Sequence, residues 1–309
     1  MISVPRHHVR RILAVVGIGI LAAVLYWAGS DAVLAALSRL SPPAIAVAVV
    51  AIVVSTLLGA WNCYRIAELR ATLSFRSFLP VFWRSWAVGI TLPGQVADFL
   101  TTLWQLKGRS TDLNFVAGRL IVDKAITLVL MLALLSLVPL AIGAGQPLLS
   151  LLVLAALGAA VAALVALLAW CRRHPDPLAR LRLGNRALRI LEGTAVPRDL
   201  ALGNAIVTSV KLLASGSAYW AVLTSITPHA PSFGATTILS QTAGLVAYVP
   251  ISFNGLGTVE ISAVAMFGAV GVESPAVLSA YIALRLITLA AAWLPAAAMT
   301  MAVPSHADP

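Results

Sequence analysis

Charged residues are scarce in this sequence. Asp, Glu, Lys and Arg make up 10% of its 309 residues, against about 25% in ordinary soluble domains. Hydrophobic residues instead reach 60%, where about 45–50% is usual. We therefore predict an all-α, polytopic membrane protein built from spanning helices, and we expect no appended soluble catalytic domain.

Cysteine and histidine are also sparse. The two cysteines, Cys63 and Cys171, are expected at helix ends and indicate neither a disulfide framework nor a metal motif. The five histidines lie in tails and loops without the convergent spacing that a zinc site needs. We therefore expect no bound metal and no cofactor.

The formal net charge of +10 would by itself be compatible with a nucleic-acid partner. However, 15 of the 21 Lys and Arg residues fall in segments that a single topology places on one side of the membrane, and only Arg39 falls on the other. The charge is thus explained by membrane topology, and we expect no nucleic acid as a partner. Both termini are predicted on the cytoplasmic side of the cytoplasmic (inner) membrane, and homo-oligomerisation stays open.

Six apolar segments are long enough to span a bilayer: residues 12–28, 44–62, 115–140, 148–170, 200–226 and 276–303. The first also has the basic and apolar regions of a signal peptide, but no clear cleavage site follows it, so we expect a retained helix. We interpret the chain as one membrane domain with four parts: N-terminal helices (1–76), a first half (77–171), a basic segment (172–199) and a second half (200–303).

The basic segment is the only long polar stretch. Its leucines at 178, 181, 188 and 191 recur at near-helical spacing, while several arginines lie off that stripe. This pattern is compatible with a solvated loop and with an amphipathic helix that contacts anionic headgroups.

Two further apolar stretches, residues 78–106 and 232–272, are broken by proline and glycine. Pro93 and Gly94 interrupt the first, and Pro250 interrupts the second. Irregular backbone survives at membrane depth only where protein or a water-filled cavity surrounds it. We therefore predict two re-entrant hairpins, or two pairs of short spans, that line a site.

The two broken stretches share a pattern. Asp98 follows the first break and Glu260 follows the second, and Arg-Leu-Ile recurs at 119–121 and 285–287. The predicted topology brings the hairpins in from opposite sides, which would make the halves inverted repeats around a midplane transport site. Two lipid-facing kinks without function are the alternative.

Ionisable residues inside spans cost roughly 2.5–3.5 kcal/mol each, which makes them functional candidates. We predict a charge network of Arg84, Asp98, Asp123 and Glu260. The predicted substrate-binding residues are Arg119, Lys124, Lys211, Arg285, Asn254, Gly255 and Gly257.

Several pairings stay open within this set. Arg119 and Asp123 are four residues apart and could satisfy one another, in which case Lys124 needs Asp98 or Glu260. Lysine and arginine near helix ends could also extend to the membrane surface. If all three acids pair, two cations remain, and a surplus of Arg and Lys suits a phosphate or another anion.

The same residues resemble those of the lysylphosphatidylglycerol synthase transmembrane-region family, a flippase-type membrane domain, over residues 44–301. Pro250-Ile251-Ser252, Gly255-Leu256-Gly257 and Glu260 are similar to its Pro-x-Ser, Gly-x-Gly and Glu signature, and Arg119 with Asp123 is similar to its Arg-x-x-x-Asp span. Pro93 to Asp98 resembles its Pro…Gly-Glu element, with Ala97-Asp98 in place of Gly-Glu and Thr101 where Arg often follows. The resemblance implies a stand-alone member that translocates lipid between leaflets and lacks the aminoacyl-transfer domain.

Three function hypotheses follow. The leading one is a flippase that moves a lipid with an anionic or lipid-linked headgroup between leaflets. A secondary transporter of a small anion is the first alternative. The second is an accessory protein or enzyme of a lipid-modification pathway, in which Asp98 and Glu260 would act as general acid and base. We expect a non-enzyme, because the sequence shows no nucleophile–base pair, metal cluster or phosphate loop.

Overall fold

The computed structural model describes residues 22–23, 26, 30–91, 97–107, 112–144, 146–174, 184–249, 252 and 255–301. This part of the chain consists of helices and turns and contains no strand, which confirms the all-α prediction. Its helices are α2 (Ser30–Leu37), α3 (Pro42–Ile66), η1 (Leu69–Ala71), α4 (Phe75–Gly89), α5 (Ala97–Leu106), α6 (Leu113–Ser136), α7 (Val138–Ala141), α8 (Pro147–Arg173), α10 (Gly184–Gly193), α11 (Arg198–Ile226), α12 (Phe233–Gly244), η2 (Leu245–Tyr248), α13 (Thr258–Gly268) and α14 (Ser274–Met301).

Four of the described helices are long and apolar enough to cross a membrane: α3, α8, α11 and α14. A fifth, α6, has 24 residues despite its charged side chains. At 1.5 Å per residue it is about 36 Å long, which exceeds a hydrocarbon core of about 30 Å. These five match the spans predicted from residue 44 onward, whereas the span predicted at 12–28 lies almost wholly outside the described residues. The protein is thus a multi-pass helical membrane bundle.

Residues at the helix starts explain where two of these spans begin. Ser41 precedes two prolines in the first turn of α3, a position where the missing N–H has no helical partner anyway. Asp112 caps α6, since its Oδ1 accepts hydrogen bonds from the backbone N–H groups of Asn114 at 3.1 Å and Phe115 at 3.2 Å. Both starts are therefore encoded locally.

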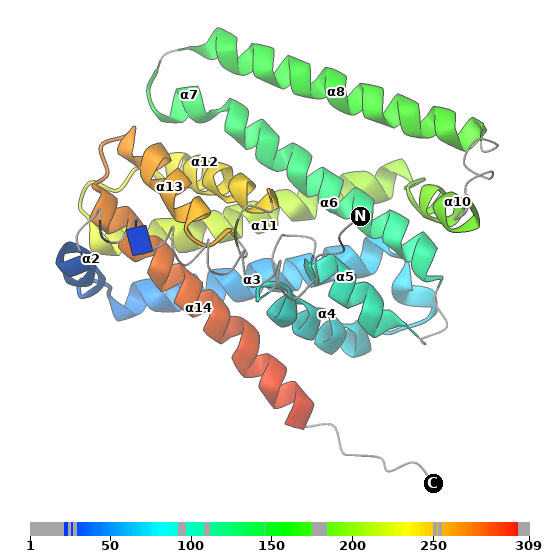
Figure 1. Cartoon of the computed structure of the whole chain (residues 1–309), viewed down its shortest axis with the longest axis horizontal. Coiled ribbons are helices and arrows are strands. Elements are labelled where there is room, and N and C mark those ends of the chain that lie inside the picture. Colours follow the sequence, from blue (N-terminus) through cyan, green and yellow to red (C-terminus); the bar gives the residue numbers. More distant parts are fainter. Residues whose placement is uncertain are drawn as a thin grey trace, which may run out of the picture.

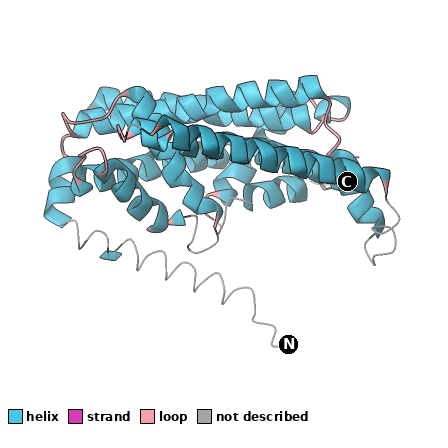
Figure 2. Ribbon diagram, turned by 90° about the horizontal axis from the view of Figure 1, so that it is seen from above, coloured by secondary structure: helices cyan, strands magenta, loops and turns pink. Residues whose placement is uncertain are grey.

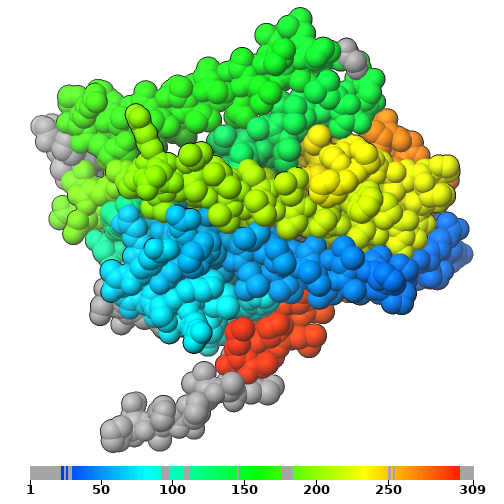
Figure 3. All heavy atoms as spheres, turned by 180° about the vertical axis from the view of Figure 1, so that it is seen from behind, coloured from blue at the N-terminus to red at the C-terminus, as the bar shows by residue number. Residues whose placement is uncertain are grey.

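The antiparallel pair α3 and α11 runs along one face of the molecule (Figure 3). Near one end, the backbone N–H of Ser41 donates to Oγ of Ser225 at 2.8 Å. Toward the other end, Nδ2 of Asn62 donates to the Asn204 carbonyl at 3.0 Å. We call the end where α3 stops and α11 starts the basic end, because it carries Arg65, Arg70, Arg76 and Arg198.

Each broken stretch folds as a hairpin of two short helices (Figure 1). The first hairpin, α4 with α5, has helices of 15 and 10 residues, and the second, α12 with α13, has helices of 12 and 11. Helices of this length reach about 15–22 Å, too short to span a bilayer. Because α4 follows the end of α3 and α12 follows the end of α11, the hairpins enter from opposite ends. The predicted breaks at Pro93, Gly94 and Pro250 lie outside the described residues.

Apolar packing gives each hairpin its own buried cluster. Leu239 of α12 and Phe267 of α13 pack in one cluster with Leu278 of α14. Phe78 of α4 and Leu106 of α5 pack in another, with residues of α3 and α6. Each hairpin is thereby held against the spanning helices beside it.

Two helices stand outside this core. The helix α8 runs along the edge of the bundle beside α6 (Figures 1 and 2), and its most apolar stretch contains no buried residue. The helix α10 lies within the predicted basic segment, and Arg186 and Arg189 are exposed on it. It packs closely on α6, because a Cβ at Gly118 would collide with the Ile190 carbonyl and a Cβ at Gly193 with the Phe115 carbonyl.

Candidate functional site

A cavity of about 580 Å³ lies where the two hairpins meet the spanning helices. Residues of both hairpins line it, together with residues of α3, α6, α11 and α14. Six ionisable side chains with carboxylate, ammonium or guanidinium groups face it: Asp98, Asp123, Lys124, Lys211, Glu260 and Arg285. The structure therefore brings together six of the eight buried charges predicted from the sequence.

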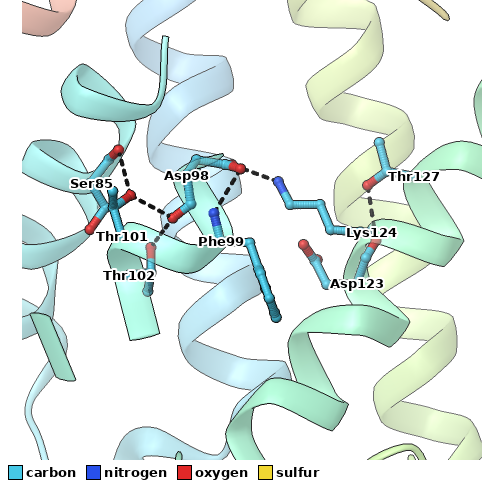
Figure 4. Close-up of polar contacts among 8 residues, drawn as sticks. All are labelled: Ser85, Asp98, Phe99, Thr101, Thr102, Asp123, Lys124 and Thr127. Atoms are coloured by element: carbon cyan, nitrogen blue, oxygen red, sulfur yellow. Dashed lines mark hydrogen bonds and ion pairs between the residues drawn. The ribbon is translucent and has the colours of Figure 1, made fainter. Parts of the chain in front are cut away.

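The first hairpin contributes an ion pair (Figure 4). Nζ of Lys124 on α6 lies 2.6 Å from Oδ2 of Asp98, which stands in the first turn of α5. Oδ1 of Asp98 accepts the Phe99 backbone N–H at 2.8 Å. At Gly89 of α4 the two hairpin helices approach so closely that a Cβ would lie 2.7 Å from the Asp98 Cβ. The break thus presents an acid to α6, and of the two partners considered for Lys124 the structure selects Asp98.

Asp123 belongs to a polar network that the sequence reasoning missed. Its Oδ1 accepts a hydrogen bond from Nδ2 of Asn204 on α11 at 2.8 Å. Nδ2 of Asn62 on α3 donates in turn to the Asn204 carbonyl at 3.0 Å and to Oγ1 of Thr208 at 2.8 Å. Both asparagines are buried. Amide side chains within apolar spans form hydrogen bonds between helices. The positions of Asn62 and Asn204 in the sequence could therefore have indicated this network.

The second hairpin contributes the other ion pair. Oε1 of Glu260 on α13 lies 2.6 Å from Nη2 and 2.9 Å from Nε of Arg285 on α14. Oε2 of the same carboxylate accepts the Gly257 backbone N–H at 2.7 Å, at the start of α13. Glu260 is 1% exposed, so its charge is matched by a guanidinium and by the positive end of a helix.

The glycines of the second break have conformations that explain them structurally. Gly255 has φ of 70° and Gly257 has φ of 78°, both in the left-handed region that favours glycine. A Cβ at Gly255 would also lie 2.5 Å from a methyl group of Val259. Asn254, predicted beside them as a substrate ligand, lies outside the described residues. The chain needs both glycines here to turn into α13.

Arg119 lies outside the cavity lining, at the basic end. Its Nη2 is 3.0 Å from Oε1 of Glu68, and its Nη1 donates to the Ala195 carbonyl at 3.1 Å. Of the pairings left open for Arg119, the one with Asp123 is not formed, since Asp123 accepts from Asn204 instead. Helical side chains lean toward the helix N-terminus, which carries Arg119 away from the cavity and toward Glu68.

Arg84 also lies outside the lining. Its Nε donates to the Pro80 carbonyl, one turn earlier in α4, at 3.2 Å. The described lining consequently carries three acids and three cations rather than a surplus of cations. Two of the cations are paired with acids, and Asp123 is held by an amide. Lys211 is the cation of the lining without an ion pair to any described residue.

Over the described ranges, no three His, Cys, Asp or Glu side chains converge in a way that could hold a metal ion. The described cavity residues offer charged and hydrogen-bonding side chains instead.

The comparison with known proteins fits this arrangement. No curated protein sequence matches the chain. The profile of the family described as the lysylphosphatidylglycerol synthase TM region matches residues 14–296, which leaves only short segments at both ends. The chain therefore belongs to the lysylphosphatidylglycerol synthase TM region family.

Proposed function

We propose that this protein moves a lipid with a phosphate-bearing headgroup between the leaflets of the cytoplasmic membrane. One observation carries the proposal: hairpins that enter from opposite ends of the bundle line a single charged cavity. Short helices that meet at such a site provide a path that can open to either side. The membership in a membrane domain family associated with a phospholipid supports a lipid substrate.

The ion pairs supply a way to couple headgroup binding to hairpin movement. Each hairpin is tied to the following spanning helix by one acid, through Asp98 to Lys124 and through Glu260 to Arg285. A phosphate can replace a carboxylate on Lys or Arg with similar geometry, because both present oxygens to charged N–H donors. Headgroup phosphate would thus release one hairpin at a time.

The corresponding positions support an inverted pair of repeats. Asp98 and Lys124 are 26 residues apart, and Glu260 and Arg285 are 25 apart. In each half the acid stands in the first turn after the break. We take Lys124, rather than Arg119, as the counterpart of Arg285.

The basic end defines the proposed orientation. Arginines in and next to α3, α4, α8, α10 and α11 gather there, as expected for the cytoplasmic face. The C-terminal end of α14, which runs from the opposite end past α4, would then be cytoplasmic. Cysteine labelling from each side of the membrane would test this.

Transport without bond chemistry accounts best for the lining. Asp98, Asp123 and Glu260 each accept a hydrogen bond from a cation or an amide, which ties up the carboxylates that general acid–base catalysis would need. We infer that the protein is not an enzyme. Turnover of a labelled phospholipid or polyprenyl phosphate by the pure protein would contradict this.

Reconstitution in liposomes tests the function. Lipid labelled in one leaflet should equilibrate with wild-type protein and should do so far more slowly with Glu260→Ala and Arg285→Ala together. A matched control is Arg189→Ala with Glu192→Ala, which removes the exposed ion pairs of Arg189 with Glu192 and Asp112, away from the cavity. Equal rates for wild type and the cavity variant would rule the proposal out. Uptake of labelled inorganic phosphate without lipid movement would favour a transporter of a soluble anion.

A further inference from the structure

One face of α11 carries polar side chains with no assigned role. Lys211, Ser215 and Tyr219 line the cavity at intervals of four residues. Residues four apart stack on the same face of an α-helix, and eight residues advance it by about 12 Å. The three side chains therefore form a continuous stripe along the direction in which a headgroup has to travel.

The side chains of this stripe have no hydrogen-bond partner among the described residues. Other hydroxyl groups on α11 behave differently. Oγ of Ser209 donates to the Ala205 carbonyl at 2.9 Å, and Oγ of Ser217 donates to the Ala214 carbonyl at 2.7 Å. Ser215 does not use this local option, so its hydroxyl stays available to the cavity.

The two ends of the stripe lie near the two ion pairs. Lys211 follows Asn204 by seven residues on α11, and Asn204 donates to Asp123 on the side of the first hairpin. The ring of Tyr219 lies 4.9 Å from the ring of Tyr281, which precedes Arg285 by four residues on α14, on the side of the second hairpin. The stripe thus connects the places where the two hairpins are fastened.

The chemistry of the stripe selects its ligand. An ammonium group is a donor only, and Ser and Tyr hydroxyls each add one O–H donor. The carboxylates of the lining are already engaged by Lys124, Arg285 and Asn204. Lys124 and Arg285 neutralise two of the three acids, while Asp123 keeps its charge under the Asn204 amide. A row of available donors beside two neutralised acids is complementary to an oxyanion.

We propose that Lys211, Ser215 and Tyr219 form a phosphate-binding track, along which the headgroup phosphate passes between the two ion pairs. This rests on the proposed lipid transport and adds the route of the headgroup. An unpaired lysine in a span is costly unless a ligand or water meets it, which makes structural use alone a poor account of Lys211. The small side chain of Ser215 keeps the middle of the track open.

Binding measurements on the detergent-solubilised full chain test the track. The probes are dihexanoyl phosphatidylglycerol and inorganic phosphate. Lys211→Met should weaken binding of both by about tenfold, and Ser215→Ala and Tyr219→Phe by about three- to tenfold each, because each removes a donor to a charged oxygen. Ser217→Ala is the matched control and should bind both probes like wild type.

The affinities of the three variants for the two probes distinguish the track from lipid transport itself. Wild-type affinity for both probes in Lys211→Met, Ser215→Ala and Tyr219→Phe would overturn the track, while leaving the liposome assay to judge lipid transport. Binding of inorganic phosphate that needs the track, with no binding of the short-chain lipid, would support the track and contradict the lipid substrate. If Lys211→Met fails to fold, the two hydroxyl deletions still decide, since neither removes a hydrogen bond within the described structure.

Discussion

Glu260 is bound by Arg285 through one carboxylate oxygen and by the backbone of Gly257 through the other. One side chain therefore starts α13 and ties it to α14. The opposite hairpin uses Asp98 in the same position, in the first turn after its break. The acid after each break is thus half of an ion pair that faces the cavity, and Glu260 also caps its helix.

Replacing Glu260 with Gln should cost stability. The change removes the carboxylate charge that binds the Arg285 guanidinium, and breaking a buried pair costs about 3–5 kcal/mol. Because Arg285 is 27% exposed toward the cavity, we expect about 2–3 kcal/mol, at or below the lower end of that range. Equilibrium unfolding in mixed detergent measures it. Glu192→Gln, in an exposed pair with Arg189, should change stability by less than about 1 kcal/mol, and equal losses in both variants would contradict this account.

Exchanging the charges of Asp98 and Lys124 tests their direct coupling. Asp98→Lys and Lys124→Asp should each slow lipid movement strongly. Each single change puts two like charges where two opposite charges now lie 2.6 Å apart. The double exchange restores an attractive pair and should recover part of the rate in the liposome assay. A double variant no faster than the slower single one would show that the two groups act separately.

The sequence predicted that each broken stretch forms short helices rather than one span, because the signals for this are local. Proline and glycine inside long apolar stretches mark the breaks, and a carboxylate just past a break can be placed in the first helical turn. The prediction that Lys124 pairs with Asp98 or Glu260 followed from helix geometry, and the structure shows Asp98. Such features need only the helix period and the bilayer thickness.

Contacts between distant segments were not predictable in the same way. The repeated Arg-Leu-Ile tripeptide indicated that Arg119 occupies the position equivalent to Arg285. In the structure, however, Arg119 binds Glu68, in a turn after α3, and does not face the cavity. Glu68 has a left-handed φ of 54°, and no local sequence pattern predicted this backbone conformation. The expected surplus of cations disappeared for the same reason, since the chain path decides which charges share the cavity.

A methyl group at Gly89 should disturb the first hairpin. In Gly89→Ala the new Cβ would lie 2.7 Å from the Asp98 Cβ, so α4 and α5 must separate. Overpacking of this kind costs about 1–3 kcal/mol, and the shift should also lengthen the Asp98–Lys124 contact and slow transport. Gly158→Ala on α8 is the control, because nothing lies within 4 Å of its Cβ position. A Gly89→Ala variant that is as stable and active as Gly158→Ala would contradict the close packing.

A substitution at Arg119 distinguishes a structural role, seen in its contact with Glu68, from the substrate-binding role predicted from the sequence. Arg119→Met removes the contacts with Glu68 and the Ala195 carbonyl, and we expect a stability loss of about 1.5–3 kcal/mol, as for a hydrogen bond to a charged group. Because Arg119 does not line the cavity, binding of dihexanoyl phosphatidylglycerol should stay within about twofold of wild type. Lys124→Met should instead weaken that binding by about tenfold. If Arg119→Met weakened lipid binding as strongly as Lys124→Met while leaving the unfolding midpoint unchanged, the direct substrate role predicted for Arg119 would replace the structural one.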